Sequence, residues 1–306
     1  MQVSEVANSE PGPEGAPFRV LGALVWAPVL AAAVFIAGFG VYKSVSPLVV
    51  GLFVILRPEA SLSDEALRLY MSLASPLAGI AFVGVYWLLV RLVERRAVVE
   101  LAPRGAWIEA ARGVGLAAAA FLLLMVVLTL AGAIAWRPPP LKTWLGHISA
   151  GLAFGIASGV LTAIVLQGVL TRLLAQTQGP VFGVVAAAFA AAWWTGGRVH
   201  VNAQLGALID GLMLALVFVR LGRLWLGMGI VATWDGLMTV VRGGFYHGDD
   251  GNAARAFIFA PEQGPLISWL RGPGGPDTSV PALVGGALAA GFLAWRAWQE
   301  GRFSRA

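Results

Sequence analysis

Long apolar stretches separated by short polar breaks run along most of this 306-residue chain. A helix needs about 20 mostly apolar residues to cross the hydrocarbon core of a bilayer, which is about 30 Å thick. Stretches of this kind, of which the fifth is short, occupy residues 20–42, 73–93, 112–136, 147–170, 180–195, 203–221, 223–241 and 280–298. The pattern predicts an all-α, multi-pass transmembrane bundle of about seven or eight helices, because an isolated β-strand cannot satisfy its backbone hydrogen bonds in lipid.

Polar segments divide the chain further. Residues 1–17 are polar, acidic and rich in Pro and Gly, which is typical of a disordered tail. Residues 18–110 contain the first helices and a basic cytoplasmic loop, 111–241 a transmembrane core, and 280–306 a final helix with a basic tail. The Gly- and Pro-rich loop 242–279 contains apolar pieces, so we expect it to lie on the membrane surface or to pack against the bundle.

The composition agrees with a membrane protein, since 58% of the residues are hydrophobic and 12% are charged, whereas soluble domains contain about a quarter charged residues. The chain has no Cys, which excludes disulfides, thiolate chemistry and Cys-based zinc sites. The formal charge of +5 is explained by basic cytoplasmic loops and by contact with anionic membrane lipids. No pattern of Arg and aromatic residues indicates nucleic-acid binding.

The densest basic cluster is in the loop 91–112, which holds five Arg. Cytoplasmic loops are enriched in Lys and Arg, so we place this loop in the cytoplasm. With eight spans, this orientation puts both termini in the cytoplasm as well. The expected location is the plasma (inner) membrane of a bacterium.

Small residues recur at every fourth position of one predicted span, at Gly151, Gly155, Gly159 and Ala163. In a membrane, this spacing lets two helix backbones approach closely. It therefore predicts that this helix is central in the bundle.

Ionisable residues inside the predicted spans are few, which makes Asp210 and Asp235 informative. Each carboxylate either has a structural pairing role or lines a polar pocket. The three His, His147, His200 and His247, share no helical face and have no carboxylate at the spacing of a metal motif. We therefore expect neither a metal site nor a cofactor.

Four segments occur in an order that resembles a known family. They are "TAIVLQGVL" (162–170), "FAAAW" (189–193), "LGRLW" (221–225) and "VATWD" (231–235). They are similar to the motifs EExxxRGxL and FxxxH, a TGSLW-like turn and the motif HAxWN/D of the CPBP family, which contains CAAX proteases and bacteriocin-processing enzymes. The resemblance covers roughly residues 91–241. It implies the fold of a CPBP-type intramembrane protease.

The residues that would carry proteolysis in that family are mostly replaced here. The motif-equivalent positions are Thr162, Ala163, Gln167, Phe189, Trp193, Val231 and Asp235. Of these, Phe189 and Asp235 keep a residue type of the motif, whereas both Glu, the Arg and both His are missing. Removing one partner of a buried ion pair costs about 3–5 kcal/mol, but replacing both is often neutral. The joint loss is the pattern expected of a site that decayed and was repacked; chance similarity among Gly- and Leu-rich helices is the rival explanation.

The function expected from this resemblance is therefore a non-catalytic pseudoprotease that binds or scaffolds a membrane partner, lipid or peptide in the former cavity. The candidate residues for lining that cavity are Gln167, Trp193, Trp194, Asp210 and Asp235. Gln167 is expected to share hydrogen bonds with Thr162, Asp235 or water. One alternative is an active endopeptidase with a rearranged site, in which His200 converges with Asp210 or Asp235. The other is a small transporter or channel that uses the intramembrane Asp residues.

Overall fold

The computed structural model describes residues 64–136, 141–196, 201–242, 257–259, 270 and 275–304, together with five single residues between 25 and 36. The predicted tail 1–17, most of the first predicted span and most of the loop 242–279 lie outside the described residues. His200 and His247 lie outside them as well, and the side chain of His147 is not described.

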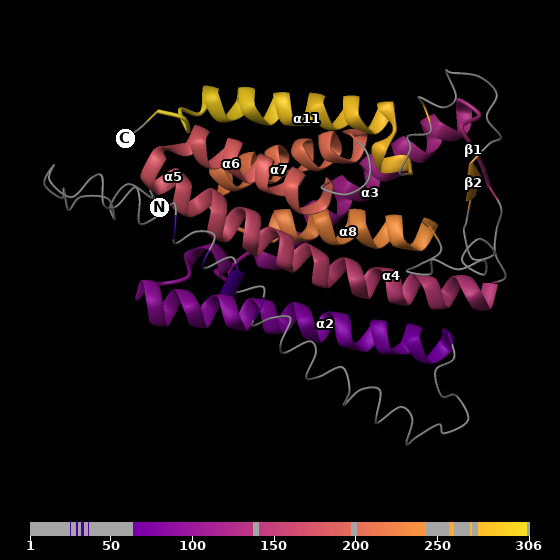
Figure 1. The fold of residues 1–306 in the computed structure, drawn as a ribbon, viewed down its shortest axis with the longest axis horizontal. Helices are drawn as coiled ribbons and strands as arrows, with labels where there is room; N and C mark the ends of the chain where they lie inside the picture. Colours follow the sequence, from indigo (N-terminus) through magenta and orange to yellow (C-terminus); the bar gives the residue numbers. More distant parts are fainter. Residues whose placement is uncertain are drawn as a thin grey trace, which may run out of the picture.

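The described chain is helical, which confirms the predicted all-α class (Figure 1). The helices are α2 (Asp64–Leu89), η4 (Val90–Glu94), η5 (Val99–Leu101), α3 (Ala106–Leu130), α4 (Leu141–Thr162), η6 (Ala163–Thr171), α5 (Arg172–Gln178), α6 (Pro180–Gly196), α7 (Val201–Leu221), α8 (Trp225–Arg242), η7 (Pro276–Thr278) and α11 (Val280–Gln299). Two three-residue strands, β1 (Ile134–Trp136) and β2 (Phe257–Phe259), pair antiparallel beyond one end of the helices, with Ala135 opposite Ile258.

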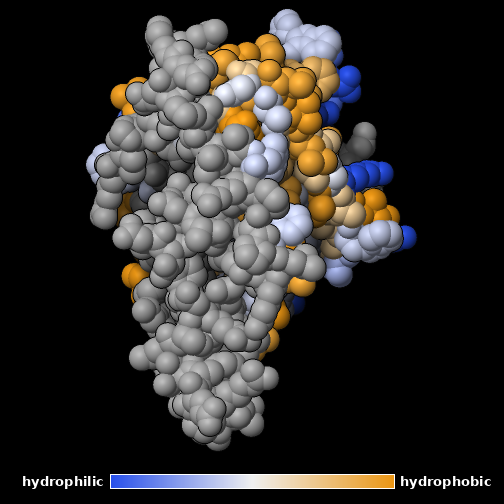
Figure 2. Space-filling model, turned by 90° about the vertical axis from the view of Figure 1, so that its right-hand side faces the viewer, coloured by the Kyte–Doolittle hydropathy of each residue, from blue (hydrophilic) through white to orange (hydrophobic). Residues whose placement is uncertain are grey.

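Five of the described helical stretches are long and apolar enough to cross a membrane. They are Ser72–Glu94, Ala106–Leu130, Ile148–Gln178, Val201–Leu221 and Val280–Gln299. Two apolar helices, Pro180–Trp194 and Trp225–Val241, are shorter. Large apolar side chains point outward from these helices, and apolar residues cover much of the visible flank of the described helices (Figure 2). Such a surface suits lipid and not water, as an integral membrane protein requires.

The long helix formed by α4, η6 and α5 lies between α2 and α8 (Figure 1). Its small residues face α8 so closely that a Cβ atom on Gly155 would lie 2.1 Å from the carbonyl oxygen of Ala232. A Cβ atom on Gly159 would lie 2.6 Å from the backbone nitrogen of Ala232, and one on Gly151 would lie 3.0 Å from the carbonyl oxygen of Gly236. These contacts confirm the predicted close approach of two backbones at the small residues of this span.

One end of the bundle brings together the end of α2, the start of α3, α5, the turn between α7 and α8, and the end of α11 (Figure 1). The segment between α2 and α3 is fixed to the α7–α8 turn there. The backbone N–H of Leu224 donates to the carbonyl of Glu100 at 3.1 Å, and the Trp225 indole donates to the carbonyl of Ala102 at 3.1 Å. Several Arg side chains gather at this end, and they belong to Arg91, Arg95, Arg96, Arg104, Arg172, Arg220, Arg223, Arg296 and Arg302.

Candidate functional site

The segment that carries the first motif-like stretch is a π-helix. The α-helix α4 ends at Thr162, and a nine-residue π-helical segment, η6, follows before α-helical geometry returns at Arg172. π-Helical geometry is rare, occurs mostly as single-turn bulges and is frequent at functional sites. All residues of η6 except Leu170 are buried. The sequence pattern predicted a continuous helix here, but nothing in it indicated the change of helix type.

Gln167 lies at the centre of η6 and is fully buried. Its side chain packs on Gly227 of α8, where a Cβ atom would lie 2.2 Å from Nε2 of the glutamine. Neither Oε1 nor Nε2 of Gln167 has a hydrogen-bond partner among the described residues. Leaving a buried amide without a hydrogen-bond partner costs roughly 1–3 kcal/mol.

The expected hydrogen bonds from Gln167 to Thr162 or Asp235 are therefore wrong. The carboxylate of Asp235 instead accepts a hydrogen bond from the hydroxyl of Ser158 on α4. Because Ser158 precedes Gln167 by more than two helical turns, Asp235 lies too far along the helix pair to reach the amide. This hydrogen bond joins α8 to α4.

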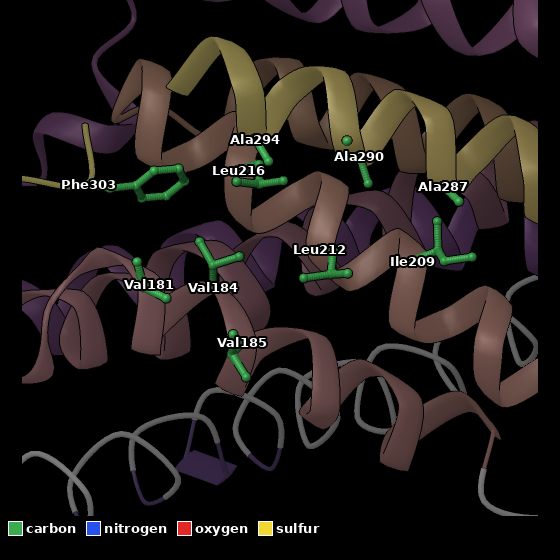
Figure 3. A pocket seen from close by; sticks show the side chains of 11 residues that line it. Val181, Val184, Val185, Ile209, Leu212, Leu216, Ala287, Ala290, Ala294 and Phe303 are labelled. Atoms are coloured by element: carbon green, nitrogen blue, oxygen red, sulfur yellow. The ribbon is translucent and has the colours of Figure 1, made fainter. Parts of the chain in front are cut away.

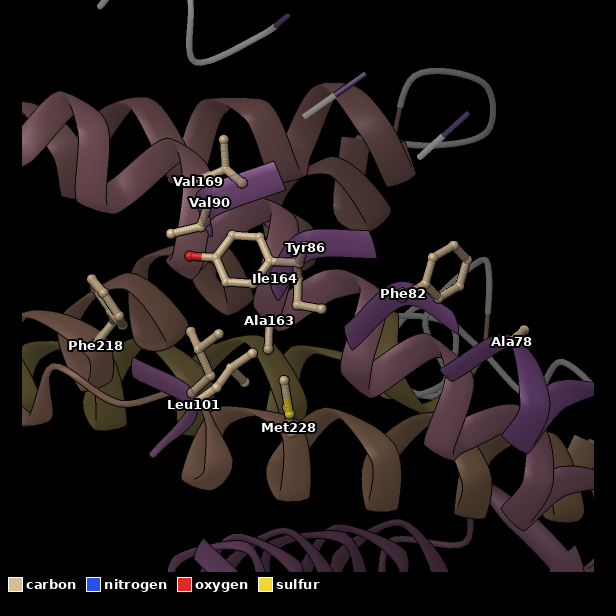
Figure 4. Packing of buried hydrophobic residues seen from close by; sticks show 11 residues of the cluster. Ala78, Phe82, Tyr86, Val90, Leu101, Ala163, Ile164, Val169, Phe218 and Met228 are labelled. Carbon is tan, nitrogen blue, oxygen red and sulfur yellow. The ribbon is translucent and has the colours of Figure 1, made fainter. Parts of the chain in front are cut away.

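The motif-equivalent positions on the long helix and on α8 share one interface. Ala163 is fully buried in the same apolar cluster as Met228 (Figure 4). Val231 packs in a second cluster with Leu166 of η6. With Gln167 on Gly227, these contacts place Ala163, Gln167 and Val231 on the two facing sides of one helix pair.

The positions equivalent to the FxxxH motif point elsewhere. Phe189 is 63% exposed, Trp193 is 85% exposed and Trp194 is 52% exposed. The reason is the packing of α6 on α7, where Gly211 lies directly against Ala187, Ala188 and Ala191 and turns the opposite face of α6 outward. The structure therefore does not bring Trp193 or Trp194 together with Gln167.

Asp210 on α7 is exposed, unlike its apolar neighbour Gly211. Asp210 and Asp235 belong to helices that make little contact with each other. Among the described residues, no hydrogen bond joins Asp210 to Gln167.

A second polar cluster, which we call the arginine cluster, lies one turn beyond Gln167 and consists of Tyr86, Glu94, Arg96, Glu100 and Arg172. The guanidinium of Arg172 binds both oxygens of Glu94, at 2.5 and 2.8 Å, and its Nε donates to the carbonyl of Gly168 at 2.7 Å. Arg96 joins Glu94 to Glu100, with distances of 2.6 Å to each carboxylate. The Tyr86 hydroxyl lies beside Glu100 and 3.0 Å from the Gly168 carbonyl, and its ring lies within the apolar cluster (Figure 4).

The two guanidinium groups of the arginine cluster balance the charge of its two carboxylates. Burial acts to raise the pKa of the Glu100 carboxyl, but hydrogen bonds from Arg96 and Tyr86 outweigh it and hold this pKa below its ordinary value. Burial likewise acts to lower the pKa of Arg96, whereas its hydrogen bonds to Glu100 and Glu94 raise it. The members of the cluster are therefore charged and paired, apart from the neutral phenol.

Sequence reasoning missed the arginine cluster. The acidic residues that form it, Glu94 and Glu100, lie in or beside the basic loop that was used only to orient the chain. An available signal was Arg172, a charge directly after an apolar run, since such a charge requires a partner.

Among the residues that the structure describes, no group of three or more His, Asp or Glu is arranged to hold a metal ion. Comparison of the chain with protein-family models, with curated proteins and with solved structures finds no match.

Proposed function

We propose that this chain is a non-catalytic member of the CPBP family that binds a membrane partner. The observation that carries this proposal is the convergence of Ala163 and Gln167 with Val231, a motif-equivalent position 64 residues further along the chain, on the buried interface between η6 and α8. General acid–base catalysis needs a titratable group within hydrogen-bond reach of the substrate. The alkyl and amide groups at these positions supply none.

The proposed topology has seven spans among the described residues, in which the two shorter apolar helices accompany the five long ones. An eighth span at 20–42 places both termini in the cytoplasm of a bacterial cell. Support comes from the arginine-rich end of the bundle, which positive-inside bias assigns to the cytoplasm. Exposed Trp107 and Trp298 lie at the same end, where an aromatic belt is expected.

The partner surface that we propose is the outward face of α6, with Phe189 and Trp193 at its centre. These large rings are exposed while the opposite face of α6 is buried against α7. Aromatic side chains of this kind contribute strongly to protein interfaces. An apolar segment of a membrane protein, a peptide or a lipid fits this face better than a polar ligand does.

Photo-crosslinking in native membranes tests the binding function. A photoreactive phenylalanine analogue replaces Trp193 or, as a control, Leu123, which is 65% exposed on α3. We expect a discrete adduct from position 193 and only diffuse lipid labelling from position 123. Equal labelling at both positions would contradict a dedicated partner surface.

A cleavage assay tests the absence of catalysis. The purified protein, reconstituted in vesicles, is incubated with a library of apolar and prenylated peptides, and the products are identified by mass spectrometry. We expect no cleavage above that of a heat-inactivated sample. Cleavage that is lost in Asp235→Asn or His200→Ala would establish the rearranged endopeptidase instead.

A further inference from the structure

Helices α6, α7 and α11 enclose an apolar groove of about 390 Å³. Its side chains include Val184, Leu212, Leu216, Ala290, Ala294 and Phe303, which point toward one another across the groove (Figure 3). Every residue that lines it is aliphatic, aromatic or glycine, and they belong to three helices and the segment after α11. The groove lies apart from the η6–α8 interface, and its exposed wall residues Val181 and Val185 lie on the same face of α6 as Phe189.

The shape of the groove is elongated along two parallel helices. Gly286 of α11 lies against Ile209 at one level, and Glu300 pairs with Arg220 of α7 further along. On the α11 side, small residues at positions 287, 290, 291 and 294 form the wall of the groove. From Ile209 to Leu216 the α7 wall extends for about 10 Å, which is a large part of the roughly 15 Å depth of one bilayer leaflet.

The groove opens to the exterior of the bundle. Val181 on one wall is 56% exposed, and Gly291 on the other wall is also exposed. The groove offers no side-chain hydrogen-bond donor or acceptor, so an unfolded peptide would leave its backbone groups unsatisfied there. A hydrocarbon chain has no such groups and fits without this cost.

Positive charge lies where the groove ends. Arg220 pairs with Glu300 at 2.6 Å, and Arg296 and Arg302 lie 3.7 and 3.9 Å from the same carboxylate. One carboxylate thus serves three guanidinium groups, and the side chains of Arg296 and Arg302 are 46% and 47% exposed. Arg302 immediately precedes Phe303, which lines the groove. This excess of positive charge complements an anionic phosphate.

We propose that the groove holds an acyl chain of an anionic phospholipid, with the lipid phosphate against Arg296 and Arg302. The apolar lining accounts for the chain, and the arginines at the end account for the sign of the headgroup charge. The arginines also lie at the end of the bundle where the headgroup layer is reached, so that both parts of one lipid molecule are bound together.

Native mass spectrometry of the purified full-length protein in nanodiscs with equal amounts of phosphatidylglycerol and phosphatidylcholine tests this proposal. We expect a phosphatidylglycerol adduct that survives release from the nanodisc. Ala287→Trp fills the groove and should abolish the adduct. Ala289→Trp is the matched control, because Ala289 is exposed on the same helix but does not line the groove. Val181→Trp blocks the opposite wall and does not alter α11.

The charge requirement is tested separately. The double variant Arg296→Gln, Arg302→Gln should lower the preference for phosphatidylglycerol over phosphatidylcholine by about thirtyfold, whereas Arg91→Gln, at the same end of the bundle but beside Trp87, should not. The proposal is overturned if the two lipids are retained equally by the unaltered protein. It is also overturned if Ala287→Trp and Val181→Trp, as monodisperse proteins, retain the adduct as Ala289→Trp does.

Discussion

Two polar side chains about one turn apart on the same buried helix, Gln167 and Arg172, have opposite surroundings. Arg172 carries a full charge and is nearly buried, yet it binds Glu94 with two nitrogens and the Gly168 carbonyl with the third. Gln167 carries no charge and is fully buried, yet its amide has no partner among the described residues. The helix thus has a charged residue at position 172, where a carboxylate faces it, and a neutral residue at position 167, where no carboxylate is in contact.

The contrast follows from the energetics of buried polar groups. A lone buried charge costs several kcal/mol, whereas an unpartnered amide costs roughly 1–3 kcal/mol and is tolerated. Residue 163, one turn before Gln167, is Ala. An arginine at position 167 would therefore lack the facing carboxylate that the second Glu of the motif EExxxR supplies. The charges of the arginine cluster are therefore paired, whereas the motif-equivalent positions Ala163 and Gln167 hold no charged pair.

The largest expected effect is that of Arg172→Met. This change leaves two carboxylates, Glu94 and Glu100, to share the single guanidinium of Arg96, so the cluster has a net negative charge and the free energy of unfolding should fall by about 3–5 kcal/mol. Arg220→Met is the control, since it breaks a partly exposed pair with Glu300 and should have a much smaller effect. Both are measured by denaturant unfolding in detergent. Similar losses for the two variants would show that burial does not make the Arg172 pairs more important than the Arg220 pair.

Gln167→Arg should be the next most damaging change. It places a charge in a closed interface with no carboxylate, and we expect a loss of about 3 kcal/mol. Adding Ala163→Glu should recover part of this loss, because residues four apart on a helix face each other. The same unfolding measurement checks both variants. A single arginine variant as stable as the unaltered protein would mean that Gln167 occupies a hydrated site.

Gln167→Met should leave stability unchanged or raise it by about 1 kcal/mol, because two unpartnered polar atoms disappear while the volume is nearly kept. Thr171→Val on the same π-helix should have the opposite sign. The Thr171 hydroxyl donates to the Leu166 carbonyl at 2.6 Å, and its loss should cost about 1 kcal/mol. A clear destabilisation by Gln167→Met in thermal unfolding would show that the amide makes a favourable interaction.

The smallest effect concerns pH. The pKa of Glu100 in the folded protein is below its ordinary value of 4.5. As the pH falls below about 4.5, Glu100 is therefore protonated in the unfolded chain before it is protonated in the folded protein, and the folded protein loses stability. The contribution of Glu100 is complete above that pH and is lost on acidification through the folded pKa. Glu100→Gln should therefore flatten the acid limb of a plot of melting temperature against pH. An unchanged acid limb would assign the acid sensitivity to other carboxylates.

The helices were predictable because lipid requires long apolar runs. The predicted spans 180–195, 203–221 and 280–298 match α6, α7 and α11 to within two residues at each end. The span 147–170 was predicted too short, because α4 continues through η6 and α5 to Gln178. Composition and length settle such elements without knowledge of their neighbours.

Contacts between distant residues were less predictable. Arg172 and Glu94 are 78 positions apart, and no local pattern connects them. Motif spacing gave the positions 189 and 193 but not the rotation of α6 about its axis, which depends on the contact of Gly211 with three Ala. The small residues of α4 were an exception, because their spacing alone determines which face can approach another backbone.

The length of the central helix has a consequence for the kind of bilayer that suits this protein. Its apolar stretch Ile148–Gln178 has 31 residues; the 22 outside the nine-residue π-helix η6 alone span about 33 Å at α-helical rise, so the whole stretch exceeds a hydrocarbon thickness of about 30 Å even at an ordinary tilt of about 20°. The surplus emerges at an end, and at the α5 end it carries Arg172 into the headgroup layer. A thicker bilayer would draw that charge back toward hydrocarbon. Reconstitution in phosphatidylcholines of increasing chain length should therefore show a melting temperature that declines once the bilayer exceeds the matching thickness, so that membrane thickness itself sorts where this protein is stable.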